Sequence, residues 1–237
     1  MASLGELKER VWEANIELPR KNLVICTFGN VSGIDRDRGV FAIKPSGVPY
    51  GELTPDSMVL VDLDNTVVEG TFKPSSDTKT HTVLYRNFPS IGGVVHTHST
   101  YATVWAQARK PIPCLGTTHA DCIPGEIPCT AVMSDEQIKH DYEEETGNQI
   151  LECFRKRSYE EIEMVLVACH GPFTWGATPE KAVYNSVILE ELAKIALYTM
   201  LLDPDVQPLK NSLLLKHYNR KHGTDATYGQ NSPKKGA

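Results

Sequence analysis

Apolar positions along this chain recur at two spacings, which separate the expected helices from the expected strands. Short apolar or β-branched runs, typical of strands, cover residues 23–27, 40–43, 58–63, 66–69, 91–95 and 164–170. Helical periodicity or helix-start signals cover residues 4–18, 75–85, 101–108, 134–157, 178–202 and 213–222. Residues 29–33 are rich in turn-forming types, so we expect a loop there.

The order of these segments predicts the fold class. Ser134 and Gln137 have the spacing of a capping box, and Pro179 after Thr178 is typical of a first helical position. Helices and strands alternate unevenly, and several strands are expected to be hairpin partners. We therefore predict an α/β fold, with one domain and a central, mainly antiparallel or mixed β-sheet flanked by helices. We expect this domain to cover residues 1–228 and a disordered tail to follow at 229–237.

Composition narrows the class of partner. The 237 residues are 41% hydrophobic and 23% charged, as in globular proteins, and the formal net charge is −6. There is no basic run beyond Lys234–Lys235, which argues against nucleic acid as a partner. No apolar stretch approaches the ~18 residues of a membrane span, and no N-terminal signal pattern is present. The six cysteines form no C-x-x-C pair and are expected to be reduced thiols of a cytoplasmic protein.

Three histidines at the ends of expected strands suggest a metal site. His96 and His98 follow the apolar run 91–95, and residues two apart on an extended strand point the same way. His170 ends the run 164–170. Three imidazoles would leave a fourth zinc position open, as catalytic zinc requires. Ordinary polar strand ends are the alternative, because histidine is frequent at half-buried positions.

Small-residue loops offer a possible phosphate site. The chain has no G-x-x-x-x-G-K-[ST], no G-x-G-x-x-G and no G-x-S-x-G motif, so the usual nucleotide and hydrolase signatures are missing. Instead, backbone N–H groups, hydroxyls and an ammonium occur together at residues 29–30, 44–47 and 75–76. Such groups can cradle a phosphate. Plain turns are the alternative for each loop.

Three further side chains have two interpretations each. Asp121, in a polar loop at 117–121, is either an acid/base group or a turn residue. Asp77 is either a base or partner of the metal site, or a helix cap. Tyr228 is either a general acid or a docked aromatic side chain.

Seven ordered motifs extend these local signals. They are residues 27–32 (TFGNVS), 43–48 (IKPSGV), 73–78 (KPSSDT), 96–99 (HTHS), 116–121 (GTTHAD), 170–173 (HGPF) and 216–223 (KHYNRKHG). With these motifs the chain resembles the L-ribulose-5-phosphate 4-epimerase family of the class II aldolase and epimerase superfamily. The resemblance covers residues 7–230.

The resemblance implies a set of site residues. It implies one zinc per subunit held by His96, His98 and His170, with Asp77 near the metal. It implies a substrate site made by Asn30, Lys44, Ser46, Gly47, Ser75, Ser76 and His217. It also implies acid/base roles for Asp121 and Tyr228, and a homotetramer in which a neighbouring subunit completes each site. Aldolases of the superfamily typically carry Glu where Asp77 stands, which favours an epimerase.

The implied reaction interconverts L-ribulose 5-phosphate and D-xylulose 5-phosphate by breaking and re-forming the C3–C4 bond, within arabinose, ascorbate or other carbohydrate catabolism. One alternative is a sugar-phosphate aldolase that releases its aldehyde. The other is a non-catalytic protein that binds metal and sugar phosphate. A three-histidine site also accepts manganese or cobalt.

Four positions depart from the family pattern: Phe28 replaces a usual Trp, Cys122 and Thr227 replace aromatic residues, and Cys169 precedes the third histidine. None of the four is an expected acid/base residue. Cys169 is an alternative metal ligand, although its side chain would face away from that of His170 on a regular strand.

Overall fold

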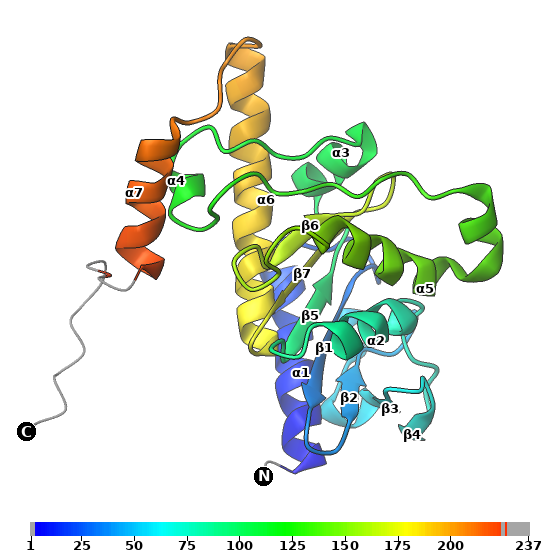
Figure 1. Cartoon of the computed structure of the whole chain (residues 1–237). Coiled ribbons are helices and arrows are strands. Elements are labelled where there is room, and N and C mark those ends of the chain that lie inside the picture. Colours follow the sequence, from blue (N-terminus) through cyan, green and yellow to red (C-terminus); the bar gives the residue numbers. More distant parts are fainter. Residues whose placement is uncertain (1–2, 224–225, 227–237) are drawn as a thin grey trace, which may run out of the picture.

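A seven-stranded antiparallel sheet forms the centre of the molecule (Figure 1). The computed structural model describes residues 3–223 and 226. The strand order across the sheet is β4 (Val67–Glu69), β3 (Val59–Asp62), β2 (Val40–Ile43), β1 (Asn30–Asp35), β5 (Gly93–His96), β7 (Pro172–Gly176) and β6 (Met164–Leu166). Every neighbouring pair is antiparallel. The predicted α/β fold with an antiparallel sheet is confirmed.

Helices cover both faces of this sheet. Helices α1 (Leu4–Arg20) and α6 (Pro179–Leu202) lie on one face, and α2 (Thr78–Asn87) and α5 (Asp135–Phe154) lie on the other (Figure 1). Helix α3 (Thr100–Ala108) packs on α6, and the short α4 (Thr117–Ala120) contacts α7 (Asn211–His222). Two 3₁₀ turns, Tyr50–Glu52 and Pro55–Ser57, precede β3. Within the described residues, no helix is both long and apolar enough to cross a membrane.

Alternation of side chains along the strands divides the core into two layers. Val94 and Trp175 pack with Tyr85 on the α2/α5 face. Val31 packs with Val11 of α1 on the opposite face. All of these side chains are fully buried, and burial of one such apolar side chain contributes about 1.5–3 kcal/mol. The sheet is therefore held from both sides, which keeps its strand ends in fixed positions.

The two predictions for residues 23–27 and 29–33 were both wrong. Residues 23–27 form no strand, and Cys26 has a φ of 53°, which extended backbone does not adopt. Asn30 to Gly33, expected as a loop, begin the central strand β1. A Cβ on Gly33 would lie 2.6 Å from Pro179 Cγ, so the small residue lets α6 approach the sheet. Tertiary packing here overrides the local preference for a turn.

Residue His170 lies in a tight turn and not at the end of one long strand. Strand β6 ends at Leu166 and β7 begins at Pro172, so the expected run 164–170 is the first arm of a hairpin. Val167 N donates to Gly171 O at 2.9 Å and closes this turn. Cys169 has a φ of 63°. The β7 strand, which follows the third histidine, was not predicted.

Expected helix boundaries were more accurate. The capping box of Ser134 with Gln137 is present, and α6 begins at Pro179 with Thr178 as its cap. Helix α1 continues through Pro19 to Arg20, beyond the expected end. Residues 117–120, expected as a loop, form the short helix α4. Asp77 precedes α2, but its side chain accepts no capping hydrogen bond there.

Candidate active site

The three predicted histidines converge. One ring nitrogen from each of His96, His98 and His170 lies within 4.8 Å of the other two. His96 ends β5 and pairs with Phe173 of β7, so the turn that carries His170 is brought beside it. His98 follows two residues later, and its Nε2 is 3.1 Å from His96 Nε2. Cys169, the alternative ligand, does not belong to this group of nitrogens.

Hydrogen bonds orient two of the rings. His96 Nδ1 lies 3.0 Å from the carbonyl oxygen of Pro172. A carbonyl only accepts, so Nδ1 carries the proton and Nε2 keeps a lone pair for a metal. Phe173 stacks on the same ring, with centroids 4.3 Å apart. His170 Nδ1 lies 3.3 Å from the Tyr142 hydroxyl.

The electrostatics of the cluster favour neutral rings for His98 and His170 beside a charged carboxylate. Burial, followed by the nearby His96, lowers the pKa of His98 and brings that of His170 to about 3. Burial opposes ionisation of Asp77, but the attraction of His96, His81 and His170 in their protonated forms, together with the hydrogen bond from Asn30, outweighs it, so the pKa of Asp77 is lowered. Neutral imidazoles with an adjacent carboxylate are the forms that bind a divalent cation, so the donor set fits a metal.

The same cavity contains the predicted phosphate loops. Its volume is about 290 Å³, and its lining includes the three histidines with Asn30, Lys44, Ser46, Gly47, Ser75, Ser76 and Asp77. Ser46 N donates to Lys73 O, and Ser75 N donates to Lys44 O, so the two loops are tied together. Gly47 has a φ of 70°, which glycine adopts without strain.

Lys44 brings a buried ammonium into this cradle. The residue is only 1% exposed, and its Nζ donates long hydrogen bonds to Thr27 O at 3.3 Å and Pro45 O at 3.4 Å. Burial lowers the pKa of Lys44 to about 8. Among the described residues, no carboxylate forms an ion pair with Lys44. A bound phosphate would supply the missing negative charge.

Asn30 links the phosphate loop to the metal cluster. Its Nδ2 donates to Asp77 Oδ2 at 2.7 Å and to Ser75 Oγ at 3.0 Å. Its Oδ1 is buried and has no hydrogen-bond partner among the described residues. A buried acceptor without a partner is costly, so a donor group of a ligand in this cavity would satisfy it.

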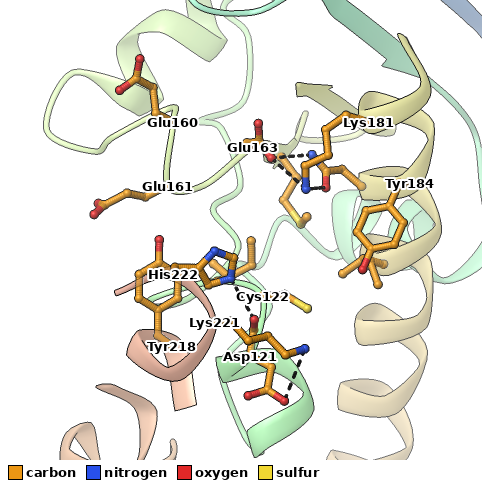
Figure 2. A pocket seen from close by; sticks show the side chains of 14 residues that line it. Asp121, Cys122, Glu160, Glu161, Glu163, Lys181, Tyr184, Tyr218, Lys221 and His222 are labelled. Atoms are coloured by element: carbon orange, nitrogen blue, oxygen red, sulfur yellow. Dashed lines mark hydrogen bonds and ion pairs between the residues drawn. The ribbon is translucent and has the colours of Figure 1, made fainter. Parts of the chain in front are cut away.

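Asp121 and His217 do not line the histidine cavity of their own chain. The Asp121 carboxylate accepts from His217 Nδ1 at 2.9 Å and from Arg220 Nη2 at 2.6 Å, and Lys221 Nζ is 3.7 Å away. Burial opposes ionisation of Asp121, but the hydrogen bonds from Arg220 and His217 lower its pKa. Asp121 lines a second cavity of about 260 Å³, where Figure 2 shows it beside Lys221 and His222.

Three further residues near the candidate site, Tyr228, Phe28 and Tyr142, differ in how their predictions compare with the structure. Tyr228 lies outside the described residues. Phe28 lines the histidine cavity, with its ring centroid 5.7 Å from that of His98. Tyr142 was missed by the sequence analysis, although its hydroxyl contacts His170. The spacing Asp141-x-x-Glu144, a helix-start pattern inside an expected helix, was the available signal.

Known proteins resemble this chain over most of its length. Residues 9–197 match the family described as "Class II Aldolase and Adducin N-terminal domain". The L-ribulose-5-phosphate 4-epimerase UlaF of Salmonella paratyphi C (strain RKS4594) is 51% identical over 227 residues, which are 96% of this chain and 100% of the relative. A solved L-fuculose 1-phosphate aldolase superposes with a TM-score of 0.76 at 25% identity, over 92% of this chain and 96% of that one. The solved structure of YgbL from Klebsiella pneumoniae, described as a putative aldolase/epimerase/decarboxylase, superposes with a TM-score of 0.71 at 22% identity, over 91% of this chain and 99% of that one.

The epimerase relative is matched along its whole length. The family match, residues 9–197, includes every residue that lines the histidine cavity. The chain therefore belongs to the class II aldolase and adducin N-terminal domain family.

Proposed function

We propose that this protein is a metal-dependent epimerase that interconverts L-ribulose 5-phosphate and D-xylulose 5-phosphate. The observation that carries the proposal is one cavity in which three imidazole nitrogens lie within 4.8 Å of one another and a buried lysine lies among small-residue loops. The name of the 51% identical relative supports the choice of substrate. The cavity of about 290 Å³ is of a size for a pentose phosphate.

His96, His98 and His170 would hold one divalent ion, with Asp77 beside it. We assign zinc, because imidazole nitrogens suit it and three protein ligands leave an open position. Manganese or cobalt would also fit these ligands. Such an ion, when bound, supplies Lewis-acid polarisation of the substrate carbonyl.

The phosphate loops explain how one C4 configuration becomes the other. Breaking C3–C4 leaves its electron pair on the three-carbon fragment and turns C4 into an aldehyde that still carries the phosphate. Lys44, Ser75 and Ser76 would hold this phosphate while the aldehyde turns its other face toward C3. The C3–C4 bond then re-forms with inverted C4. Retention of the fragment makes the second step intramolecular, which avoids the entropic cost of recapture.

Acid/base chemistry requires groups on both faces of C4, because its oxygen loses a proton on one face and gains one on the other. We propose Asp121 and Tyr228 for these roles, with His217 beside Asp121. Since neither Asp121 nor His217 lines the cavity of its own chain, we propose that they complete the cavity of a neighbouring subunit in a homotetramer. Arg220 and His217 keep Asp121 in the ionised form, which is the form that can accept a proton, but their hydrogen bonds also make it a weaker base than a free carboxylate.

The free thiols and the proposed substrate support a proposal for the cellular setting. All six cysteines are free, and we propose a cytoplasmic enzyme of sugar catabolism, such as arabinose or ascorbate use.

The test is a metal-dependent assay on L-ribulose 5-phosphate with the product identified by ¹³C NMR. We expect D-xylulose 5-phosphate to accumulate, and a chelator to stop the reaction until zinc is restored. Accumulation of free glycolaldehyde phosphate instead would identify the aldolase alternative. Metal binding without any turnover would identify the non-catalytic alternative.

A further inference from the structure

Helix α5 is broken at a single residue beside the histidine cluster. Asp141 has φ −159° and ψ 93°, which are extended and not helical values. Its Oδ1 accepts a hydrogen bond from Glu144 N at 3.3 Å, the contact that an N-cap side chain makes with the third helical residue. Asp141 therefore starts a second helical segment inside α5, and Tyr142 is the first residue of that segment.

Contacts with α2 fix the position of this break. Lys79 forms an ion pair with Asp141, and Thr80 Oγ1 donates to Glu143 O at 2.5 Å. These two contacts lie on either side of Tyr142 in the sequence. The Tyr142 hydroxyl then lies 3.3 Å from His170 Nδ1, with ring centroids 5.9 Å apart.

His170 needs such a partner more than His96 does. His96 lies on strand β5 and is oriented by a backbone carbonyl, that of Pro172. His170 lies outside the strands, in a turn where its backbone N–H donates to Val167 O at 3.0 Å. Among the described residues, its ring nitrogens have one hydrogen-bond partner, the Tyr142 hydroxyl.

We propose that Tyr142 is a positioning residue of the metal site: its hydroxyl accepts from His170 Nδ1–H and so leaves Nε2 for the metal, and the Lys79–Asp141 ion pair holds Tyr142 there. The inference rests on the metal site of the proposed function. Partners of this kind set the tautomer and the orientation of a ligand histidine. Removing one typically costs 10–100-fold in metal affinity.

The test compares two tyrosine hydroxyls. Tyr142→Phe removes the partner of His170 and keeps the ring. Tyr198→Phe is the matched control, because Tyr198 is an exposed residue of α6 whose hydroxyl pairs with that of Tyr101 at 3.2 Å, and it does not line the histidine cavity. Each metal-free variant competes with a chromophoric chelator for Zn²⁺, and its Co²⁺ form is examined by visible absorption.

We expect Tyr142→Phe to bind Zn²⁺ about 10–100-fold more weakly, with an altered Co²⁺ spectrum and an unchanged melting temperature. Tyr198→Phe should match the wild type in all three measurements. If Tyr142→Phe has wild-type affinity and a wild-type Co²⁺ spectrum, the positioning role is wrong. If the wild type binds no metal, the metal site fails and this inference fails with it. Tight metal binding with no epimerase activity would overturn the proposed reaction and leave the role of Tyr142 standing.

A second variant tests the ion pair. Lys79→Met should also weaken Zn²⁺ binding, because it frees the segment that carries Tyr142. In the Tyr142→Phe background, the same change should have little further effect, since Lys79 acts through the tyrosine. An equal loss in both backgrounds would show that Lys79 does not act through Tyr142.

Discussion

Replacing Lys44 by Met is expected to weaken the binding of phosphorylated substrate and to stabilise the protein without ligand. Both effects have one cause, which is the ammonium group of Lys44. This residue is 1% exposed and lies among the loops at residues 44–47 and 75–76. In the empty cavity this charge costs free energy. In the proposed substrate complex it would interact with the phosphate. The substitution removes the cost and the interaction together.

The stability effect follows from the pKa of Lys44. Burial lowers this pKa from 10.5 to about 8, and each pKa unit corresponds to about 1.4 kcal/mol. The folded protein therefore pays about 3 kcal/mol at pH 7 to keep Lys44 charged. Because the unfolded chain binds this proton more tightly, wild-type stability should rise as the pH increases from 8 to 10.5. Loss of the long hydrogen bonds to Thr27 and Pro45 offsets part of the gain, so we expect Lys44→Met to be about 1–3 kcal/mol more stable at pH 7.

The binding effect has the opposite sign. A hydrogen bond to a charged group contributes about 1.5–3 kcal/mol, which corresponds to an increase in KM of about 10- to 150-fold. Metal content should stay at the wild-type level, because Lys44 is not among the clustered nitrogens. The wild-type KM should also rise above pH 8 as Lys44 loses its proton, whereas the KM of the variant should lack this component.

Urea unfolding at pH 7 and pH 10.5, with steady-state kinetics, measures both effects. Lys73→Met is the control, because it removes a positive charge from an exposed residue close to the same loops. We expect the control to change stability by less than about 0.5 kcal/mol. A Lys44→Met protein with wild-type KM would make Lys44 a turn residue only. A variant less stable than wild type at pH 7 would refute the buried-charge argument.

Three other outcomes are expected. His96→Ala should lose metal and activity together, and full metal content by elemental analysis would remove His96 from the site. Gly93→Ala should destabilise the fold by about 1–3 kcal/mol or more, because its Cβ would lie 2.5 Å from Pro179 Cα, and an unchanged melting temperature would show that α6 shifts freely. Refolding Tyr228→Phe together with His96→Asn should restore activity if the tyrosine acts in a neighbouring subunit; an inactive mixture, with hybrids seen by native mass spectrometry, would exclude this.

The sequence predicted correctly the helix starts, which depend only on interactions between neighbouring residues. The Ser134 cap and the Thr178-Pro179 start are present because each needs only its own helix turn. Strand β1 was not predicted, because its Gly33 is explained by close contact with Pro179 of α6, almost 150 residues later in the chain. Local preference for a turn could not reveal that contact.

The candidate site was predictable to a similar extent. His96 ends β5 and His98 follows two residues later, so the convergence of the two rings follows from the period-two geometry of extended backbone. The place of Asp121 was not predictable, because the partners that hold it, His217 and Arg220, lie on α7 and only tertiary packing brings them there. The role of Tyr142 was not predicted for another reason. The helical pattern of the sequence continues through residue 141, so it gave no indication of the internal cap at Asp141.

Strand register connects the packing of α6 to the candidate site on the other face of the sheet. One row of paired residues across β1, β5 and β7 consists of the glycines Gly33, Gly93 and Gly176, and α6 packs directly on them. Three residues along the same strands, about 10 Å away, lies the row of Asn30, His96 and Phe173.

Three is an odd number of residues, so the two rows face opposite sides of the sheet. A slip of β5 by one residue would place Val94 or Gly92 in the glycine row and would also turn His96 away from the cavity. Val94 cannot occupy the row, because even a Cβ at position 93 would lie 2.5 Å from the Pro179 backbone. Close contact of α6 with the glycine row thus disfavours the slip that places Val94 there, one of the two slips that would turn His96 away from the cavity. Gly33 of β1, which belongs to that row, therefore helps to fix the position of the candidate site on the opposite face.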